Sequence, residues 1–293
     1  IMPVFREYER CSTTALAAYV QPVIAAYLSR FEASLSKRGF AGQFSVMQSN
    51  GGRLPSRAMS RNAITSLFSG PAAGVVGAAR QAARAGFSDV ITFDMGGTST
   101  DVCLVEAGTA QLVSETEVDG LPVKTPVLDI ATVGAGGGSI IWIDDGGMLR
   151  VGPTSAGAEP GPACYGRGGQ VPTITDAHVL RGTLRPQTFL DGRMAVDVDA
   201  AKAAFVQLAA TLGVTPVEAA DSAIRVAEAN IVRAIQRIST ERGKDPRDYA
   251  LVAFGGAGPM QAARVAEELG LTTVIIPPHA GVLSAYGLLV SDY

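Results

Sequence analysis

The chain has 293 residues, of which 47% are hydrophobic and 17% charged, so it is long enough to fold as one large or two ordinary globular domains. A formal net charge of -3 without dense lysine or arginine runs argues against nucleic acid or an anionic membrane as the main partner. Three cysteines without a CxxC pair predict neither a disulfide framework nor a zinc site.

We expect a cytoplasmic protein that acts on small molecules. Charge or glycine is expected to interrupt every apolar stretch before the ~20 residues that a membrane helix needs, and no signal segment opens the chain. Residues 1–5 offer no clear initiator and lead straight into a helical pattern. The sequence therefore predicts a piece cut from a longer polypeptide.

The first third of the chain predicts two helices and a strand. Apolar residues recur at three- and four-residue steps over 12–37, which is typical of an amphipathic helix, and Gly39 ends the pattern. A short strand is expected over 44–48. Pro71 stands where a helix begins, and the small-residue run 72–85 continues that helix.

The middle of the chain is predicted to be rich in strands. Apolar runs at 90–93 and 102–105 flank one glycine turn, and runs at 127–133 and 140–143 flank a glycine loop at 134–138. A hairpin turn and then an irregular, ordered loop are expected after these strands, over 144–147 and 153–169 respectively.

Helices and strands alternate in the last third. One long apolar stripe predicts a helix over 216–242, and a glycine cluster precedes the helix expected over 259–269. This alternation predicts an α/β fold. The expected helices cover 200–212, 216–242, 259–269 and 281–289, and the expected strands cover 251–254 and 273–276.

The segment 94–101 (DMGGTSTD) carries the sharpest chemical signal, because its glycines let backbone amides approach phosphate oxygens that a Cβ would obstruct. Asp94, at a strand end, is placed to hold magnesium through water or to orient an attacking oxygen, and Asp101 to shape the turn or the metal shell. A plain hairpin with two glycines at positive φ is the alternative. Hydrogen bonds to a nucleotide are expected from Gly96, Gly97, Thr98, Ser99 and Thr100.

A second glycine cluster lies between a strand and a helix, where free helix amides suit a phosphate or adenosine group. A compact helix start is the structural alternative. No GxxxxGK[ST] loop and no full dinucleotide fingerprint occur, so neither P-loop nor Rossmann chemistry is predicted. The residues of this cluster are Gly255, Gly256, Ala257, Gly258 and Pro259.

Further candidates lie outside these two segments. Asp129 near the glycine loop and Asp176 carry carboxylates suited to a substrate or metal site. His178 is predicted to be a helix cap or a surface residue, and Cys164 is predicted to be structural, because no basic neighbour would lower its pKa.

Several segments together resemble known families. Residues 93–102 (FDMGGTSTDV) are similar to the second phosphate motif of the actin, sugar-kinase and heat-shock-chaperone ATPase superfamily. Residues 133–140 (VGAGGGSI), 155–166 (SAGAEPGPACYG) and 253–259 (AFGGAGP) resemble the hydantoinase A / 5-oxoprolinase family, and the similarity runs nearly end to end. The shorter segments 69–74 (SGPAAG), 241–248 (ERGKDPRD) and 281–285 (GVLSA) also resemble that family.

The resemblance implies a ribonuclease H-like ATPase fold, with a mixed sheet flanked by helices. It implies one ATPase domain over 1–293, subdivided at most into 1–88, 89–199 and 200–293. ATP and magnesium are implied at 94–101. We expect Gly136 and Gly137 among the nucleotide-binding residues, and Asp94, Asp101 and Asp129 as the catalytic ones. The family's earlier Asp-Gly-Gly-Thr loop has no counterpart before Asp94, so we expect a fragment that lacks its amino-terminal lobe and is inactive alone.

The implied activity is ATP-dependent opening of a cyclic amide or imide of the hydantoin, N-methylhydantoin or 5-oxoproline type, together with a hydantoinase B-like subunit. The alternatives are a ketone carboxylase subunit and a non-catalytic nucleotide-binding or assembly module. Ala131 and Gln261 stand where members of the family often have histidine, which predicts altered chemistry, another substrate or reduced activity.

Overall fold

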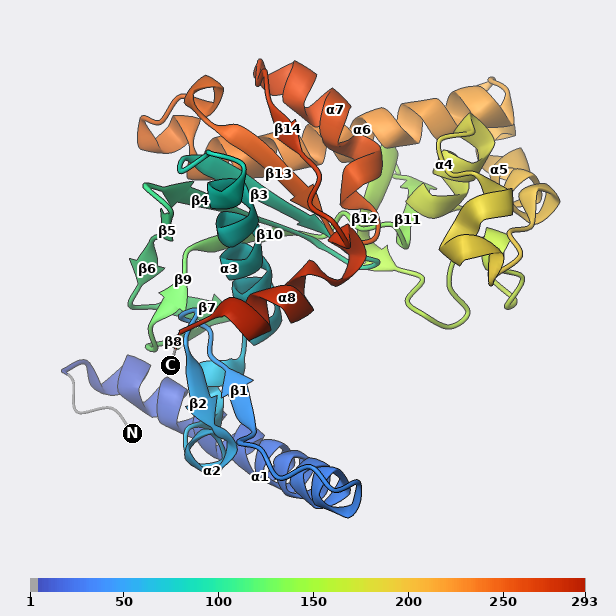
Figure 1. Ribbon diagram of the computed structural model, residues 1–293. Coiled ribbons are helices and arrows are strands. Elements are labelled where there is room, and N and C mark those ends of the chain that lie inside the picture. The colour runs from blue at the N-terminus through green and yellow to red at the C-terminus, as the bar shows by residue number, and fades with distance from the viewer. Residues whose placement is uncertain (1–4, 293) are drawn as a thin grey trace. The chain divides into compact units, whose positions relative to one another are not determined.

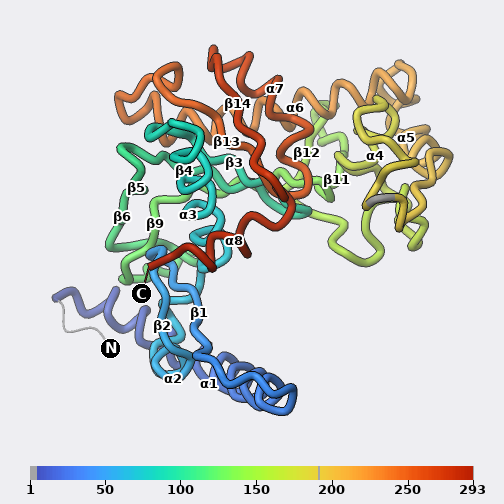
Figure 2. Tube along the Cα trace, in the orientation of Figure 1, coloured from blue at the N-terminus to red at the C-terminus, as the bar shows by residue number. Residues whose placement is uncertain are grey.

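The computed structural model describes residues 5–292 (Figures 1 and 2). The contacts within the chain divide it into two compact units. One boundary of this division follows Ser88, and residues on both sides of position 200 contribute to the second unit. The expected ATPase domain and its subdivision into 1–88, 89–199 and 200–293 stay predictions. Unit 1 holds the described residues up to Ser88, residues 105–130 and those from Val282 onward; unit 2 holds residues 89–104 and 131–281.

Unit 1 combines helices with short antiparallel strand pairs. Helix α1 begins earlier than predicted and ends just before Gly39, as expected. Its helices are α1 (Glu7–Lys37), α2 (Ser56–Met59), α3 (Ser69–Arg84) and α8 (Leu283–Val290), and its strands are β1 (Ser45–Met47), β2 (Arg53–Pro55), β5 (Thr109–Ala110), β6 (Leu112–Val113), β7 (Thr116–Val118), β8 (Leu121–Val123) and β9 (Val127–Leu128).

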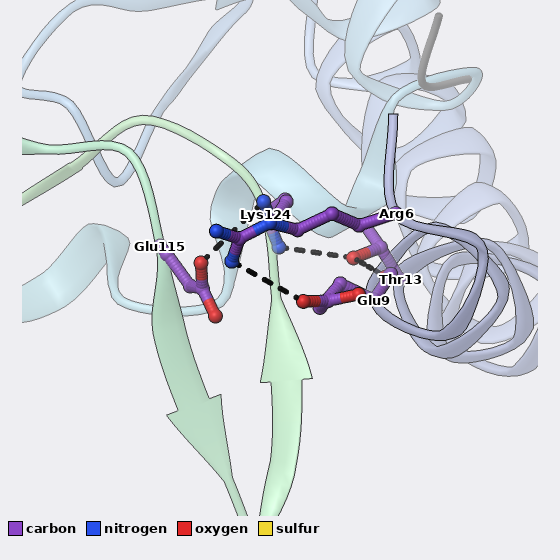
Figure 3. Close-up of polar contacts among 5 residues, drawn as sticks. All are labelled: Arg6, Glu9, Thr13, Glu115 and Lys124. Atoms are coloured by element: carbon purple, nitrogen blue, oxygen red, sulfur yellow. Dashed lines mark hydrogen bonds and ion pairs between the residues drawn. The ribbon is translucent and has the colours of Figure 1, made fainter. Parts of the chain in front are cut away.

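Helix α1 is joined to the hairpin of β7 and β8 by a buried threonine (Figure 3). The Thr13 hydroxyl accepts a hydrogen bond from the Lys124 amide at 2.9 Å and donates one to the Glu9 carbonyl oxygen at 2.7 Å. The Lys124 ammonium lies 3.6 Å from the Glu115 carboxylate. These contacts anchor the amino-terminal half of the helix within unit 1.

The prediction that no apolar stretch reaches membrane-spanning length is wrong for α1. Within residues 5–292 this helix is long and apolar enough to cross a membrane by length and composition, and so is the bent pair 198–212 and 216–242 when the two helices are taken together. Core helices and signal sequences of other proteins have the same composition. The finding concerns composition and does not assign the chain to a membrane.

Two glycines let α3 and α8 approach each other closely in unit 1. A Cβ on Gly77 would lie 2.9 Å from the Leu283 carbonyl oxygen and 3.1 Å from the Gly287 Cα. A Cβ on Gly287 would overlap the Ala73 carbonyl oxygen. Backbone atoms cannot yield as a flexible side chain can, so the crossing requires glycine at both positions.

We expect Gly287→Ala to destabilise the protein by about 1–3 kcal/mol, because α8 must move away from α3 to make room for the methyl group. Urea unfolding measures this loss. Gly70→Ala is the matched control, since Gly70 lies in α3 and a Cβ there would meet no atom within 4 Å, so this variant should be neutral or stabilising. Equal losses in both variants would contradict the close-packing explanation.

Unit 2 is built on a sheet with strand order β10-β4-β3-β13-β14. Strand β13 is parallel to both β3 and β14, whereas the last residues of β4 pair antiparallel with the short β5, so the sheet is mixed. Nearly every residue of β3 and β13 is buried, as expected for strands covered on both faces. The strands are β3 (Val90–Met95), β4 (Thr100–Glu106), β10 (Ile130–Val133), β13 (Ala250–Phe254) and β14 (Val274–Ile275).

Helices and a hairpin complete unit 2. Helix α6 begins with a capping box between Thr215 and Glu218, and its predicted apolar stripe is buried. It ends at Ile238, before the predicted end, because Ser239 leaves helical geometry. The remaining elements are the hairpin of β11 (Ser139–Ile143) and β12 (Leu149–Ser155), and helices α4 (Ile174–Arg181), α5 (Val198–Leu212), α6 (Pro216–Ile238) and α7 (Gly258–Leu269).

The predicted α/β fold, a mixed sheet flanked by helices, is confirmed. Helix α7 packs on β3 and β13, and α6 packs on α7 and on β12. The large buried side chains between these layers include Phe93, Leu251 and Ile231. This core fixes the ends of β3 and β13, where the glycine-rich segments begin.

Candidate functional site

The two predicted glycine segments meet at one edge of the sheet in unit 2. Strands β3 and β13 are parallel, with Asp94 opposite Phe254, so both strands end side by side. Gly255 has a φ of 80°, and a Cβ there would overlap the Asp94 Oδ1 and the Met95 carbonyl oxygen. Only a residue without a side chain lets β13 pass this close to Asp94.

The turn at residues 96–99 presents three unpaired amides. The Gly96 amide donates to the Ser99 carbonyl oxygen at 3.1 Å, whereas the amides of Gly97, Thr98 and Ser99 have no acceptor among residues 5–292. Gly97 and Thr98 are exposed, and no atom lies within 4 Å of a Cβ built on Gly97. Successive free amides at an open turn form a site suited to an anion.

The glycine loop at 134–138 forms hydrogen bonds to the carbonyl groups of this turn. The Gly137 amide donates to the Gly96 carbonyl oxygen at 2.9 Å, and the Gly138 amide donates to the Gly97 carbonyl oxygen at 2.6 Å. The Gly136 amide is also occupied, by the Ser139 hydroxyl at 2.8 Å. Gly137 and Gly138 therefore fix the carbonyl side of the turn, whereas the Gly136 amide closes the loop itself. Direct contact of Gly136 and Gly137 with a nucleotide stays a prediction.

Neither Gly96 nor Gly97 adopts a positive φ, so the alternative of a hairpin that needs glycine for its backbone angles does not explain them. At Gly97 the missing side chain instead leaves the space beside the turn open. Thr100 differs from its neighbours, because it is fully buried and its hydroxyl donates to the Ala135 carbonyl oxygen at 2.5 Å. The Thr100 hydroxyl is therefore not available for the predicted contact with a nucleotide.

Asp94 and Asp101 form a pair of half-buried carboxyl groups beside the turn. Burial, and secondarily the charge of Asp101, raise the pKa of Asp94 to about 6. Burial also raises the pKa of Asp101, opposed by a hydrogen bond from the Thr132 hydroxyl at 2.5 Å. No lysine, arginine or histidine in the described part of the chain pairs with either carboxyl group.

The second glycine cluster also contributes a free amide. Gly256 is exposed, with no acceptor for its amide among the described residues, whereas the Gly255 amide donates to Ala280 and the Ala257 amide to Met95. Gly258 and Pro259 form the first turn of α7, with Gly258 buried against β3. Contact with a bound group is therefore sterically open at Gly256 and closed at Gly258.

The other candidate residues lie outside the two glycine-rich segments. Asp129 belongs to unit 1, where its amide donates to the Gln111 carbonyl oxygen, and its catalytic role stays a prediction. Asp176 is fully buried and caps α4 in a capping box, which explains it without a ligand. The surface prediction for His178 is wrong: it is 1% exposed, and burial lowers its pKa to about 4. Cys164 is buried, as a structural residue would be.

Of the two residues that depart from the family pattern, Gln261 lies in the core of unit 2 and Ala131 lies at its margin. Gln261 is fully buried, and its amide nitrogen lies 3.4 Å from the Met95 Sδ. Ala131 packs against the hydrophobic core. No group of three or more histidine, cysteine, aspartate or glutamate side chains with metal-binding geometry occurs within residues 5–292.

Comparison with known proteins decides the family. The family model described as hydantoinase/oxoprolinase matches residues 10–293. The chain belongs to this family. The predicted resemblance to hydantoinase A and 5-oxoprolinase is therefore confirmed.

Relatives with known names match the chain over its whole length. Caprolactamase subunit alpha of Pseudomonas jessenii is 41% identical over 293 residues, which cover 100% of this chain and 42% of that protein. The solved structure of ATP-dependent caprolactamase from that organism superposes with a TM-score of 0.86. The 5-oxoprolinase of Dictyostelium discoideum is 37% identical over 100% of this chain and 25% of its own length.

Nucleotide-free acetone carboxylase has a similar structure, with 30% identity and a TM-score of 0.91 over 99% of this chain and 41% of that chain. The chain thus spans less than half the length of each of these relatives.

The sequence analysis does not identify one residue that lies beside the candidate site, Thr132, because no motif includes it. Its only sequence signal is a hydroxyl on a strand next to the glycine loop.

Proposed function

We propose that this chain is the ATP-handling part of an enzyme that opens a cyclic amide or imide. The observation that carries the proposal is the turn at 96–99, with its carbonyl groups held by the glycine loop and three amides left free beside two carboxyl groups. Such a turn suits the phosphates of ATP, because amides at fixed positions stabilise developing phosphate charge without reorganising.

Magnesium fits the remaining chemistry of this edge. Carboxylate oxygens are preferred ligands of Mg²⁺, and the Asp94 and Asp101 carboxyl groups have no basic partner in the described chain that would compete with the ion. Bound there, Mg²⁺ would supply neutralisation of phosphate charge. Asp94 lies near the end of β3, just before the turn that carries the free amides, and is our candidate for holding it.

The reaction we propose activates the amide carbonyl. The carbonyl oxygen attacks the γ-phosphorus of ATP and ADP leaves, so that the ring carbon carries a phosphate. Water then adds to this carbon, and the C–N bond breaks as the nitrogen takes up a proton, which leaves an acyl phosphate. A second water hydrolyses the acyl phosphate to a carboxylate and free phosphate. The free amides at 97–99 keep the transferred group in position, so the protein needs little covalent chemistry of its own.

The family supports the substrate class and the partner. The caprolactamase relative is ATP-dependent by its name and is a subunit alpha, and another relative is a 5-oxoprolinase. We extend the ATP dependence and the division into subunits to the present protein. We propose in addition a cyclic amide as substrate, a hydantoinase B-like second subunit, a longer polypeptide as the active enzyme, and a cytoplasmic location.

A ketone carboxylase subunit is the second candidate, favoured by the structural match to acetone carboxylase. In this case the ketone oxygen, as its enol, receives the phosphoryl group before carboxylation. The full-length protein with its partner subunit discriminates between the two. ADP release driven by lactams or hydantoins, with a ring-opened product, supports our proposal; ADP release driven only by ketones with bicarbonate rejects it.

Nucleotide affinity in the presence of magnesium should fall as the pH is lowered from about 7.5 to about 5. The pKa of Asp94 is raised to about 6, so below that pH its carboxyl group gains a proton and loses the charge that attracts the metal. Titration calorimetry with ATP at several pH values measures the effect. Asp94→Asn provides the control, since it keeps the titration of ATP itself, and identical pH profiles in both proteins would contradict a role for Asp94.

A further inference from the structure

The Asp101 carboxylate is held by a single donor. Asp101 lies at the start of β4, and Thr132 lies on β10, the neighbouring strand in the sheet. The Thr132 hydroxyl donates to Asp101 Oδ1 at 2.5 Å. Asp101 Oδ2 has no donor within residues 5–292, so one oxygen is fixed and the other stays available.

Asp101 would not keep this position without a donor. It is half-buried close enough to Asp94 for the two charges to repel, and no basic side chain in the described part of the chain offsets that repulsion. A half-buried carboxylate can still turn its charge toward water, whereas a charge-assisted hydrogen bond restrains it. Thr132 is itself exposed and makes no other side-chain hydrogen bond in the described chain, so its hydroxyl serves Asp101 alone.

We propose that Thr132 is a positioning residue that keeps the Asp101 carboxylate beside Asp94, so that both carboxylates act on one magnesium-nucleotide complex. The proposal rests on the proposed ATP site. It assigns a function to Thr132, which lies outside the glycine-rich segments 94–101, 133–140 and 255–259. It also gives Asp101 a role distinct from shaping the turn, because the hydrogen bond from the Gly96 amide to the Ser99 carbonyl oxygen already closes that turn.

Two substitutions separate the hydroxyl from the rest of the side chain. Thr132→Val keeps the size and the β-branched shape that suits a strand but removes the donor, and Thr132→Ser keeps the donor but removes the methyl group. Because the position is exposed, valine should leave the unfolding midpoint close to that of the wild type. A loss in Thr132→Val that Thr132→Ser restores therefore reports the hydroxyl and not packing.

The test titrates the full-length protein with ATP at a series of Mg²⁺ concentrations. We expect Thr132→Val to need roughly 10-fold more Mg²⁺ for half-maximal binding, as for loss of an outer-shell ligand contact, with affinity for magnesium-free ATP unchanged. Thr132→Ser should match the wild type. The double variant Asp101→Asn with Thr132→Val should be no weaker than Asp101→Asn alone, because Thr132 acts through Asp101.

Three outcomes would overturn the proposal. A Thr132→Val protein with wild-type magnesium dependence shows that the hydroxyl is not needed, and a Thr132→Ser protein as weak as Thr132→Val assigns the effect to packing. Additive losses in the double variant show that Thr132 does not act through Asp101. Failure of the wild type to bind ATP at any Mg²⁺ concentration is recognisably different, because it rejects the proposed function and this inference with it.

Discussion

Gly136→Ala is expected to weaken ATP binding by roughly 10- to 100-fold, the equivalent of about 1–3 kcal/mol of overpacking. A Cβ on Gly136 would lie 2.6 Å from the Thr98 amide nitrogen and 2.7 Å from the Gly97 carbonyl carbon. The methyl group must therefore push the turn at 96–99 away from the loop that holds it. Gly136 does not have a positive φ, so alanine brings no backbone strain and the effect is steric.

Calorimetric titration with ATP and magnesium measures this loss in the full-length protein. Gly70→Ala again serves as the control, because a Cβ at this position would meet no atom within 4 Å and Gly70 lies outside the site. Circular dichroism and urea unfolding establish that the Gly136→Ala protein is folded. A folded Gly136→Ala protein with wild-type affinity would show that the position of the turn does not matter for the nucleotide.

Asp94→Asn is expected to lower magnesium-dependent ATP turnover by roughly 10- to 100-fold without lowering stability. The amide has the shape of the carboxyl group but carries no charge for the metal. In the native protein the Asp94 carboxylate is half-buried, repelled by Asp101 and without a described basic partner, so removing its charge should leave the free energy of unfolding unchanged or increase it. This opposition between activity and stability distinguishes a functional carboxylate from a structural one.

Asp144→Asn is the matched control, for which the expected effects on stability and on ATP turnover are reversed. Asp144 accepts hydrogen bonds from the amides of Gly146 and Met148 and lies 2.7 Å from the Arg150 guanidinium, contacts that lower its pKa. We expect this variant to lose some stability and to keep ATP turnover. Loss of stability in Asp94→Asn, with turnover retained, would instead make Asp94 a structural residue.

Local patterns are sufficient to predict most of the fold. The capping box of Thr215 and Glu218 and the buried stripe that follows it specify α6 from a single stretch of sequence. The segment 94–101 is recognisable for the same reason, since strand, turn and polar residues are contiguous. The two-unit division is not predictable in this way, because unit 1 collects segments from the start, the middle and the end of the chain.

Contacts between distant segments explain what the sequence does not reveal about the site. Thr100 shares a polar motif with Thr98 and Ser99, yet its hydroxyl turns inward to Ala135, and only the packing of the glycine loop determines this. Thr132 reaches Asp101 from 31 residues away along the chain. The burial of His178 is not predictable either, because a single polar side chain in a helix gives no sign of it.

The free amides at 97–99 are expected to hold the phosphates of ATP, and every other role proposed for this site depends on that contact. A crystal structure of the full-length protein with magnesium and a non-hydrolysable ATP analogue tests it most directly. We predict phosphate oxygens within hydrogen-bonding distance of the Gly97, Thr98 and Ser99 amides, with the metal on the side of Asp94. An analogue bound elsewhere, with these three amides still facing water, would contradict the proposed function.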